Sequence, residues 1–347
     1  MLYVQSGKIK DRKMKEKKIV EFCDVVKTYG SGEGKQIAVD HVNFSIGAGE
    51  IVGIVGESGS GKTITVQTIM GLKKPDAHIA EGEIVFNGTD LLKISDEELA
   101  KIQGNDMSMV FQEPMTSLNP VKKIGWQVAE SLRIHTSMSD DEIQRRVMEI
   151  LSNVGLPKPE QLCQKYPHQL SGGMRQRVMI AMAMICWPKL LVCDEPTTAL
   201  DVTVQAQILQ LLRKIHAEAN TSILFISHDL NVVKEVCQRV IVMYKGKIVE
   251  EGYTEDVLYH PKHEYTKGLL KSIPRLDAKE HERLVPIEGT PIDLLNPPKG
   301  CPFAPRCSSC MKICLKEMPP VSTFGEVHYT QCWMNQKAQM EGGENLG

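Results

Sequence analysis

The feature that most constrains the fold is a glycine-rich loop that directly follows an apolar, β-branched run. The run, residues 50–55, fits a buried parallel strand. The loop fits the phosphate-binding pattern G-x-x-x-x-G-K-[ST] through Gly56, Glu57, Ser58, Gly59, Ser60, Gly61, Lys62 and Thr63. Its glycines allow a tight turn whose N–H groups face phosphate oxygens, and a helix beginning near Gly61 adds its positive end. The sequence therefore predicts an α/β fold that binds a nucleotide.

The residues around this loop predict a magnesium-dependent site. Lys62 would reach the β- and γ-phosphates, and the Thr63 hydroxyl would be a ligand for Mg²⁺. A second apolar run, residues 189–193, is followed by Asp194 and Glu195. Because an open parallel sheet binds its ligand at the carboxyl ends of its strands, Asp194 can hold the metal, directly or through water. Glu195 is the candidate general base for the water that attacks the γ-phosphate.

A Ser-Gly-Gly turn lies between the loop and these acids. The segment 170–177 reads Leu-Ser-Gly-Gly-Met-Arg-Gln-Arg and leads into a strongly apolar helix pattern. Loop, turn and acidic strand end in this order are far more restrictive than the loop alone. The order resembles the ATPase subunits of ABC transporters, and the resemblance covers nearly the whole chain. It implies a P-loop NTPase (RecA-like) core with an antiparallel β part and a helical subdomain, plus a small irregular C-terminal extension.

The resemblance implies that two ATPase subunits share each nucleotide. The chain has one phosphate loop, yet Ser171, Gly172 and Gly173 form a second anion-binding helix start. In the head-to-tail dimer of the family, this turn caps the γ-phosphate held by the partner's loop, so that ATP joins the two subunits. The loop at residues 196–201, which ends in Asp201, would cross the dimer interface and contribute to the nucleotide site.

Three further residues have expected roles by the same resemblance. Tyr29 would stack on adenine. Gln112 would sense the attacking water and the metal, as one of its ligands, and would link hydrolysis to the membrane partner. His228 would contact the γ-phosphate and help to orient the water. The catalytic residues expected are therefore Glu195, His228 and Gln112.

Turn and helix signals organise the rest of the chain. Asn87-Gly88 and Lys245-Gly246 predict hairpins, and residues 140–154 predict an amphipathic helix. The first 18 residues hold seven Lys/Arg and two acids without an apolar period, with Met14 as an alternative start, while eight prolines between 286 and 320 break regular patterns. The parts expected are a basic tail at 1–18, an ABC ATPase domain at 19–260 and an extension at 261–347. Within the ATPase domain, the core is expected at 19–110 and 187–260 and the helical subdomain at 111–186.

Two groups of segments resemble the oligopeptide, dipeptide and nickel importers of this family. The first group is 112–120, 166–169 and 174–182, and Met174 there resembles the first of the two different ATPase subunits of such importers. The second group is 260–266 and 300–307, with Glu264 in place of the usual proline. The expected function is ATP hydrolysis coupled to uptake of di- or oligopeptides across the cell membrane. Nickel or another small solute is the alternative.

The resemblance also implies the partners and the location. The partners are a second homologous ATPase subunit in a heterodimer, two transmembrane permease subunits and an extracytoplasmic solute-binding protein. The longest apolar run, residues 178–187, is far shorter than a membrane span, and no signal-peptide pattern is present. The chain is therefore expected to be peripheral, on the cytoplasmic face of the cell membrane.

Two other classes of function fit the sequence less well. A soluble ABC ATPase that acts on DNA or ribosomes would need a long coiled-coil insertion or two ATPase units, and the sequence shows neither. The net charge of −2 gives no nucleic-acid footprint. A regulatory nucleotide-binding protein without turnover would not need Glu195 and His228.

Five of the ten cysteines lie in the last fifty residues, at Cys301, Cys307, Cys310, Cys314 and Cys332. A cytosolic location disfavours structural disulfides, so the clustering suggests a metal. The spacing lacks the paired C-x-x-C of common zinc modules, whereas four thiolates suit a [4Fe–4S] cluster. Some family members carry such a cluster at the positions of Cys301, Cys307, Cys314 and Cys332. Zinc and unmetallated thiols stay open, and Cys310 could replace a neighbour as ligand.

Overall fold

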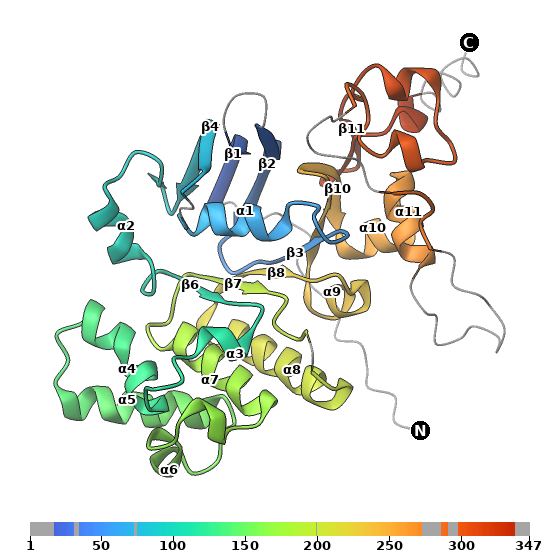
Figure 1. The fold of residues 1–347 in the computed structure, drawn as a ribbon. Helices are drawn as coiled ribbons and strands as arrows, with labels where there is room; N and C mark the ends of the chain where they lie inside the picture. Colours follow the sequence, from blue (N-terminus) through green and yellow to red (C-terminus); the bar gives the residue numbers. More distant parts are fainter. Residues whose placement is uncertain are drawn as a thin grey trace.

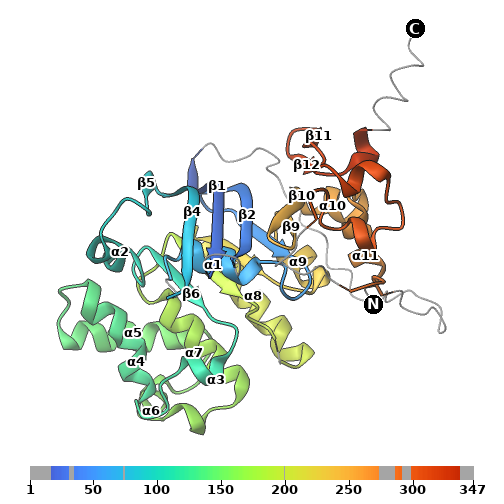
Figure 2. The same cartoon turned by 45° about the horizontal axis from the view of Figure 1, so that its top comes forward.

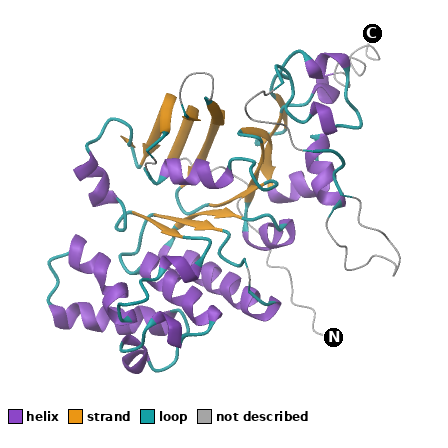
Figure 3. Cartoon of the chain, viewed as in Figure 1, coloured by secondary structure: helices purple, strands orange, loops and turns teal. Residues whose placement is uncertain are grey.

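The computed structural model describes residues 17–30, 35–72, 75–198, 200–272, 286–290 and 298–336. The predicted basic tail lies outside these residues except for its last two. The described chain forms two sheets with a group of helices beneath them and the C-terminal extension at the far end (Figures 1 and 3). This is the mixed α/β architecture that the sequence predicts.

The larger sheet has the strand order β11-β12-β10-β9-β3-β8-β7-β6 in the described part of the chain. Neighbours from β9 to β6 pair in parallel. Every residue of β3, β7 and β8 is buried, as expected for strands covered on both faces. The parallel strands are β3 (Ile51–Val55), β6 (Met107–Val110), β7 (Leu190–Asp194), β8 (Ser222–Ile226) and β9 (Arg239–Tyr244).

The two faces of these strands belong to two separate cores. On β7, Leu191 and Cys193 pack into the core shared with the helical subdomain. Leu190 and Val192 pack into the core shared with the smaller, antiparallel sheet. Because successive side chains of a strand point to opposite faces, one continuous apolar run serves both layers.

The antiparallel sheet and two hairpins agree with the turn signals of the sequence. Its order is β2-β1-β4-β5, with strands β1 (Lys18–Tyr29), β2 (Gln36–Gly47), β4 (Ala77–Phe86) and β5 (Thr89–Asp90). Asn87 and Gly88 have φ of 48° and 87° and join β4 to β5, which confirms the predicted hairpin. Lys245 and Gly246, with φ of 48° and 83°, likewise join β9 to β10 (Lys247–Tyr253).

Helices fill the segment from 111 to 186 and cover one side of the large sheet (Figure 2). The predicted amphipathic helix is confirmed as α5, which Ser139 starts by a capping box with Glu142. Among the described helices, none has the length and apolar character that crossing a membrane requires. This subdomain comprises α3 (Pro114–Ser117), α4 (Ile124–His135), α5 (Asp140–Asn153), α6 (Pro159–Cys163) and α7 (Gly172–Met184). The other α-helices are α1 (Lys62–Ile69), α2 (Asp96–Ile102), α8 (Val202–Ala219), α9 (Leu230–Val236), α10 (Thr254–Tyr259) and α11 (Glu264–Lys271).

The C-terminal extension joins the large sheet, although the sequence predicted an irregular segment. Strands β11 (Ser322–Phe324) and β12 (His328–Thr330) form a hairpin, and β12 pairs antiparallel with β10. Strands of three residues between prolines and turns are too short to show a period of two, so the sequence gives no signal for them. The extension therefore continues the ATPase sheet at its edge.

Buried polar contacts hold this edge together. Glu250 of β10 is fully buried, and its carboxylate accepts the N–H groups of Lys262 and His263 at 2.6 and 2.9 Å. The Nε2 atom of His328 on β12 lies 2.7 Å from Glu250 Oε1. One carboxylate thus connects β10, the start of α11 and the extension. Because this carboxylate is fully buried, losing any of these hydrogen bonds would destabilise the fold.

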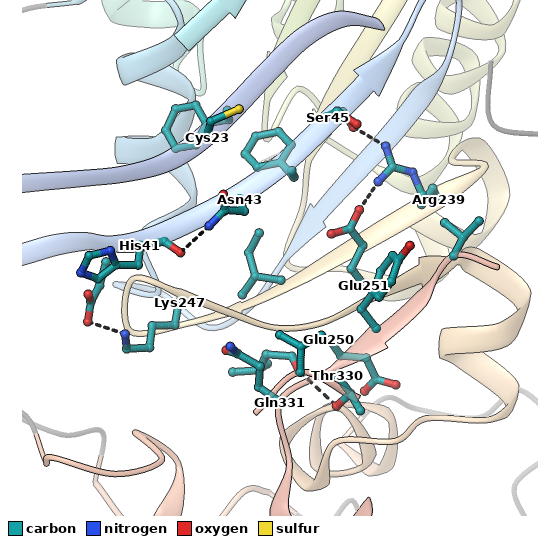
Figure 4. Close-up of a pocket in the computed structure, with 18 of the residues that line it drawn as sticks. Cys23, His41, Asn43, Ser45, Arg239, Lys247, Glu250, Glu251, Thr330 and Gln331 are labelled. Atoms are coloured by element: carbon teal, nitrogen blue, oxygen red, sulfur yellow. Dashed lines mark hydrogen bonds and ion pairs between the residues drawn. The ribbon is translucent and has the colours of Figure 1, made fainter. Parts of the chain in front are cut away.

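A pocket of about 570 Å³ lies between the antiparallel sheet, β10 and the extension (Figure 4). Arg239, which is 2% exposed, lies in the wall of this pocket. Its guanidinium donates hydrogen bonds to Glu251, to the Ser45 carbonyl oxygen and, at 2.8 Å, to Glu50 Oε1. Burial raises the pKa of Glu251, and the charge of Arg239 opposes that shift. Arg239 and its acceptors satisfy one another's hydrogen bonds, so their role is to connect the two sheets.

The buried imidazole of His263 predicts acid sensitivity of the fold. Burial lowers its pKa from 6.5 to about 4, so the folded chain favours the neutral ring. As pH falls from about 6.5 to 4 the unfolded state binds a proton that the folded state does not, and we expect a loss of about 3 kcal/mol in the free energy of unfolding. His263→Asn, which keeps an acceptor for the Tyr265 N–H, should flatten this dependence in denaturant titrations. The exposed control His260→Gln should retain it.

Candidate functional site

The phosphate-loop sequence forms a tight loop between β3 and α1. A Cβ atom at Gly56, whose φ is 154°, would lie 2.3 Å from the Met243 carbonyl oxygen, and Gly61 begins α1 with a φ of 103°. Only glycine tolerates both the backbone angles and the close approach. The loop thus lies at the carboxyl end of a central parallel strand, where such sheets bind their ligands.

Lys62 lies over this loop and is buried. Its Nζ donates to the carbonyl oxygens of Gly56 and Glu57 at 2.7 and 3.0 Å. Burial lowers the pKa of Lys62, and the carboxylates of Glu195, Asp194 and Glu57 oppose that shift. The ammonium group therefore sits among acceptors that bound phosphate oxygens could replace.

Asp194 and Glu195 follow each other at the end of β7 but face different surroundings. Asp194 is 3% exposed and accepts the Thr63 hydroxyl at 3.3 Å. Burial raises the pKa of Asp194 to about 6; the Glu195 charge adds to the shift, whereas Thr63 and Lys62 oppose it. Thr63 and Asp194 are adjacent oxygen donors, which suits Mg²⁺.

Glu195 has a left-handed backbone, with a φ of 47°. A non-glycine residue in this region stores strain of about 1–3 kcal/mol, and such residues cluster at functional sites. The bond from its N–H to the Ile226 carbonyl oxygen, at 3.1 Å, fixes the turn. The turn directs the side chain away from Asp194 and toward three other segments.

Three donors converge on one oxygen of Glu195. Gln112 Nε2 lies 3.2 Å, Thr198 Oγ1 2.9 Å and His228 Nδ1 3.1 Å from Glu195 Oε2. With an ionised Glu195, the hydrogen of a neutral His228 ring is on Nδ1. His228 is 62% exposed and Glu195 14%, so the histidine lies at the open side of the carboxylate.

These residues and the loop surround one cavity of about 500 Å³. Its walls consist of Ser58, Gly59, Ser60, Gly61, Lys62, Thr63, Ile64, Gln112, Glu195 and His228. The structure therefore brings together the phosphate loop and all three predicted catalytic residues, whose roles stay predictions. Thr198 was missed, because a threonine in a loop has no distinguishing signal in one sequence.

The other predicted nucleotide contacts do not line this cavity. Tyr29 ends β1, where it pairs with Gln36 and Ala77. Ser171 starts α7, and its hydroxyl accepts the Met174 N–H at 3.3 Å. Gly172 has open space around it, and Asp201 starts α8 by accepting the Val204 N–H at 2.9 Å. A Cβ atom at Gly173 would lie 2.9 Å from Val204, so the starts of α7 and α8 are neighbours. Their expected roles across a dimer interface stay predictions.

Four of the five clustered cysteines line one small cavity. Cys301, Cys307, Cys314 and Cys332 lie in its wall, while Cys310 does not. All ten cysteines of the described chain are free thiols. Burial raises the pKa of Cys301 to about 12 and that of Cys307 to about 11.

The sulfur positions bear on which group would fit. Among the described residues, the only group of three or more His, Cys, Asp or Glu ligand atoms within 4.8 Å of one another is at the exposed Asp24, His41 and Glu81. The cysteine sulfurs are therefore wider apart than the tetrahedral ligands of one zinc ion, at Zn–S distances of about 2.3 Å. The group itself stays a prediction.

Sequence comparisons match two families along the chain. A family described as "ABC transporter" matches residues 39–198, and one described as "Oligopeptide/dipeptide transporter, C-terminal region" matches residues 249–314. The dipeptide transport ATP-binding protein DppD of Bacillus subtilis is 49% identical, over 90% of this chain and 92% of its own length. The oligopeptide transport ATP-binding protein OppD of Salmonella typhimurium is 47% identical, over 91% of this chain and 93% of its own.

Solved structures show the same fold. The dimeric structure of MJ0796, a bacterial ABC transporter cassette, has a TM-score of 0.61 and 33% identity, covering 68% of this chain and 98% of that one. CbiO1 from Clostridium perfringens, part of the ABC transporter complex CbiONQ, has a TM-score of 0.60 and 28% identity, covering 71% and 92%. The predicted P-loop NTPase fold is therefore confirmed.

Proposed function

The chain belongs to the ATP-binding subunits of ABC transporters, and we propose that it hydrolyses ATP to drive uptake of di- or oligopeptides across the cell membrane. The observation that carries the proposal is the cavity in which Glu195, with Gln112 and His228 on its carboxylate, faces the phosphate loop at Lys62. The names of these relatives, dipeptide and oligopeptide transport ATP-binding proteins, support peptides over nickel as the solute.

The residues of the cavity divide the work of phosphoryl transfer. Lys62 and the loop N–H groups bind the phosphates. Thr63 and Asp194, with Gln112 at the cavity wall, would hold Mg²⁺, which neutralises charge on the phosphates when bound. Glu195 accepts hydrogen bonds on one oxygen from Gln112, Thr198 and His228, and it would polarise the attacking water as a general base. His228 at the open side of the site would orient this water toward the γ-phosphate.

The proposal includes the partners that the family implies. A permease surface is supported by a cleft of about 280 Å³ beside Gln112, lined by Phe111, Met109, Met179, Met182 and Leu72 among others. Phe111, in the wall of this cleft, is 44% exposed. Exposed apolar groups around a cleft are typical of a binding surface. We infer that the partners are two permeases, a second ATPase subunit and a solute-binding protein. The Ser171 turn would cap the nucleotide of the second ATPase subunit. This chain would lie on the cytoplasmic face of the membrane.

The proposal extends to the cysteine-lined cavity. Four convergent thiols at Cys301, Cys307, Cys314 and Cys332 support a [4Fe–4S] cluster as a structural staple of the extension. The small, proline-rich extension has few large apolar side chains, and such segments commonly need a metal or disulfides.

Replacing the proposed base should separate binding from chemistry. We expect Glu195→Gln to retain MgATP binding and to slow hydrolysis by about two to four orders of magnitude, because only the base is lost. Lys62→Ala should instead lose ATP binding, since its charge meets the phosphates in the ground state. Calorimetry and steady-state ATPase assays measure both effects, and normal turnover of Glu195→Gln would exclude the assigned base.

Replacing Phe111 should uncouple the subunit from its membrane partners. In a complex with the permeases and second ATPase, Phe111→Ser should lower the stimulation of ATPase activity by substrate-loaded binding protein, because the cleft loses its exposed aromatic ring. ATP binding by the isolated variant should match that of the parent chain. Tyr259→Ser, which removes a side chain that is 60% exposed on α10, is the control. Equal stimulation of the Phe111 and Tyr259 variants would refute this docking surface.

The cysteine assignment predicts colour and iron content. Protein purified without oxygen should be brown, absorb broadly near ~400 nm and contain about four irons per chain. Cys314→Ser or Cys332→Ser should bleach it, whereas Cys310→Ser should not, because Cys310 lies outside the cavity wall. Colourless protein with one zinc per chain would support zinc instead, and colour loss in Cys310→Ser would reassign the ligands.

A further inference from the structure

A side chain of the C-terminal extension reaches the phosphate loop. Arg306 ends a short 3₁₀ helix, Ala304–Arg306, and is 249 residues from Glu57, the second residue of the loop. Its Nη1 and Nη2 atoms donate to the two carboxylate oxygens of Glu57 at 2.6 and 3.1 Å. The Arg306 side chain is 3% exposed and the Glu57 side chain 30%. A paired fork at this burial fixes both the charge and the direction of the Glu57 side chain.

The same extension region holds the backbone of Glu57. The Glu57 N–H donates to the hydroxyl of Tyr265, on α11, at 2.8 Å. The Glu57 carbonyl oxygen accepts Lys62 Nζ at 3.0 Å and the Ser60 N–H at 3.2 Å. One loop residue is thus bound on one side by residues from beyond the ATPase core and on the other by the phosphate-binding lysine.

Arg306 is itself held rigidly. Its Nε and Nη2 atoms donate to the carbonyl oxygens of Glu288 and Ile287 at 3.0 and 3.1 Å. The Tyr244 hydroxyl lies 3.3 Å from Nη1. Tyr244, Tyr265 and Phe303 pack with ring centroids 4.6 to 5.4 Å apart. With three acceptors and an aromatic cluster around it, the side chain has little freedom to follow Glu57 if the loop moves.

The charges around the loop give this contact a consequence for nucleotide binding. Asp194, Glu195 and Glu57 all interact electrostatically with Lys62, so the cation that meets the phosphates lies in the field of three carboxylates. Arg306 neutralises the carboxylate that belongs to the loop itself. Without it, Glu57 would present an unpaired negative charge to an incoming polyanion.

We propose that Arg306 is a positioning residue of the nucleotide site, through which the folded extension sets the affinity of the phosphate loop for ATP. The inference rests on the proposed function only in taking MgATP as the ligand of the loop. Arg306 is not among the residues that line the cavity at the loop; it acts on Glu57, which carries the carbonyl acceptor of Lys62. The extension then contributes to ATP binding as well as to the sheet edge.

The test is a double-mutant cycle in the full chain. In Arg306→Met, we expect the Kd and KM for MgATP to rise about tenfold, because Glu57 is left as an unpaired negative charge on the loop, while kcat changes much less. Calorimetry and ATPase kinetics measure these constants. For Arg306→Lys, which keeps the charge and loses the paired hydrogen bonds, we expect a smaller rise in the Kd and KM for MgATP. Lys312→Met, which removes an exposed charge of the extension, is the matched control.

The second arm separates a charge effect from loss of fold. In the Glu57→Gln background, Arg306→Met should change the Kd less than about twofold, because no unpaired carboxylate remains. An equal rise in both backgrounds, or no rise in Arg306→Met at all, would overturn the inference. Melting curves of each variant show whether a rise in Kd follows from unfolding. If Arg306→Met is unfolded, the same cycle is repeated with Arg306→Lys in the parent and Glu57→Gln backgrounds. A parent chain that binds no MgATP would refute the proposed function itself.

Discussion

The buried ammonium group of Lys62 is the charge on which the nucleotide site depends. Burial lowers its pKa, and three carboxylates, Glu195, Asp194 and Glu57, oppose that shift. The same carboxylates would repel a polyphosphate, so their placement matters as much as the lysine. Asp194 is covered beneath Thr63, Glu195 turns away on a left-handed backbone toward Gln112 and His228, and Glu57 is paired with Arg306. Of these three carboxylates only Glu195 lines the cavity, where it lies opposite the cation and the N–H groups of the loop.

Two packing layers make this placement rigid. β3 and β7 direct alternate side chains into the core of the helical subdomain and into the core under the antiparallel sheet. The loop after β3 and the acids after β7 therefore lie at the ends of strands that cannot rotate without opening both cores. The glycine at the start of the loop adds a local constraint, since a Cβ atom there would lie 2.3 Å from a carbonyl oxygen of Met243.

The sequence predicted the elements with a local signal and missed those without one. The loop, the β3 and β7 strands, both hairpins and α5 follow from glycine chemistry, apolar runs and caps, which act over a few residues. Roles for Gln112 and His228 at the nucleotide site were expected by resemblance, whereas their convergence on the Glu195 carboxylate comes only from the tertiary fold. Thr198, Tyr265 and Arg306 carry no signal, because a threonine, a tyrosine and an arginine are ordinary residues until the chain folds. The strands β11 and β12 are too short for periodicity.

The boundary drawn near residue 260 from the sequence passes through a single packed body. β12 pairs with β10, the buried Glu250 accepts bonds from Lys262, His263 and His328, and Arg306 binds the loop. Removing the extension would expose the edge of β10 and leave an acid without donors, both of which are costly. It would also release Glu57 on both its carboxylate and its N–H. The cysteine-lined cavity flanks the helix that carries Arg306, since Cys301 and Cys307 lie on either side of Ala304–Arg306. The fold of the cysteine region and the position of the phosphate loop are thus connected through one short segment. The position of Glu57 in the loop therefore depends on the stability of the cysteine region.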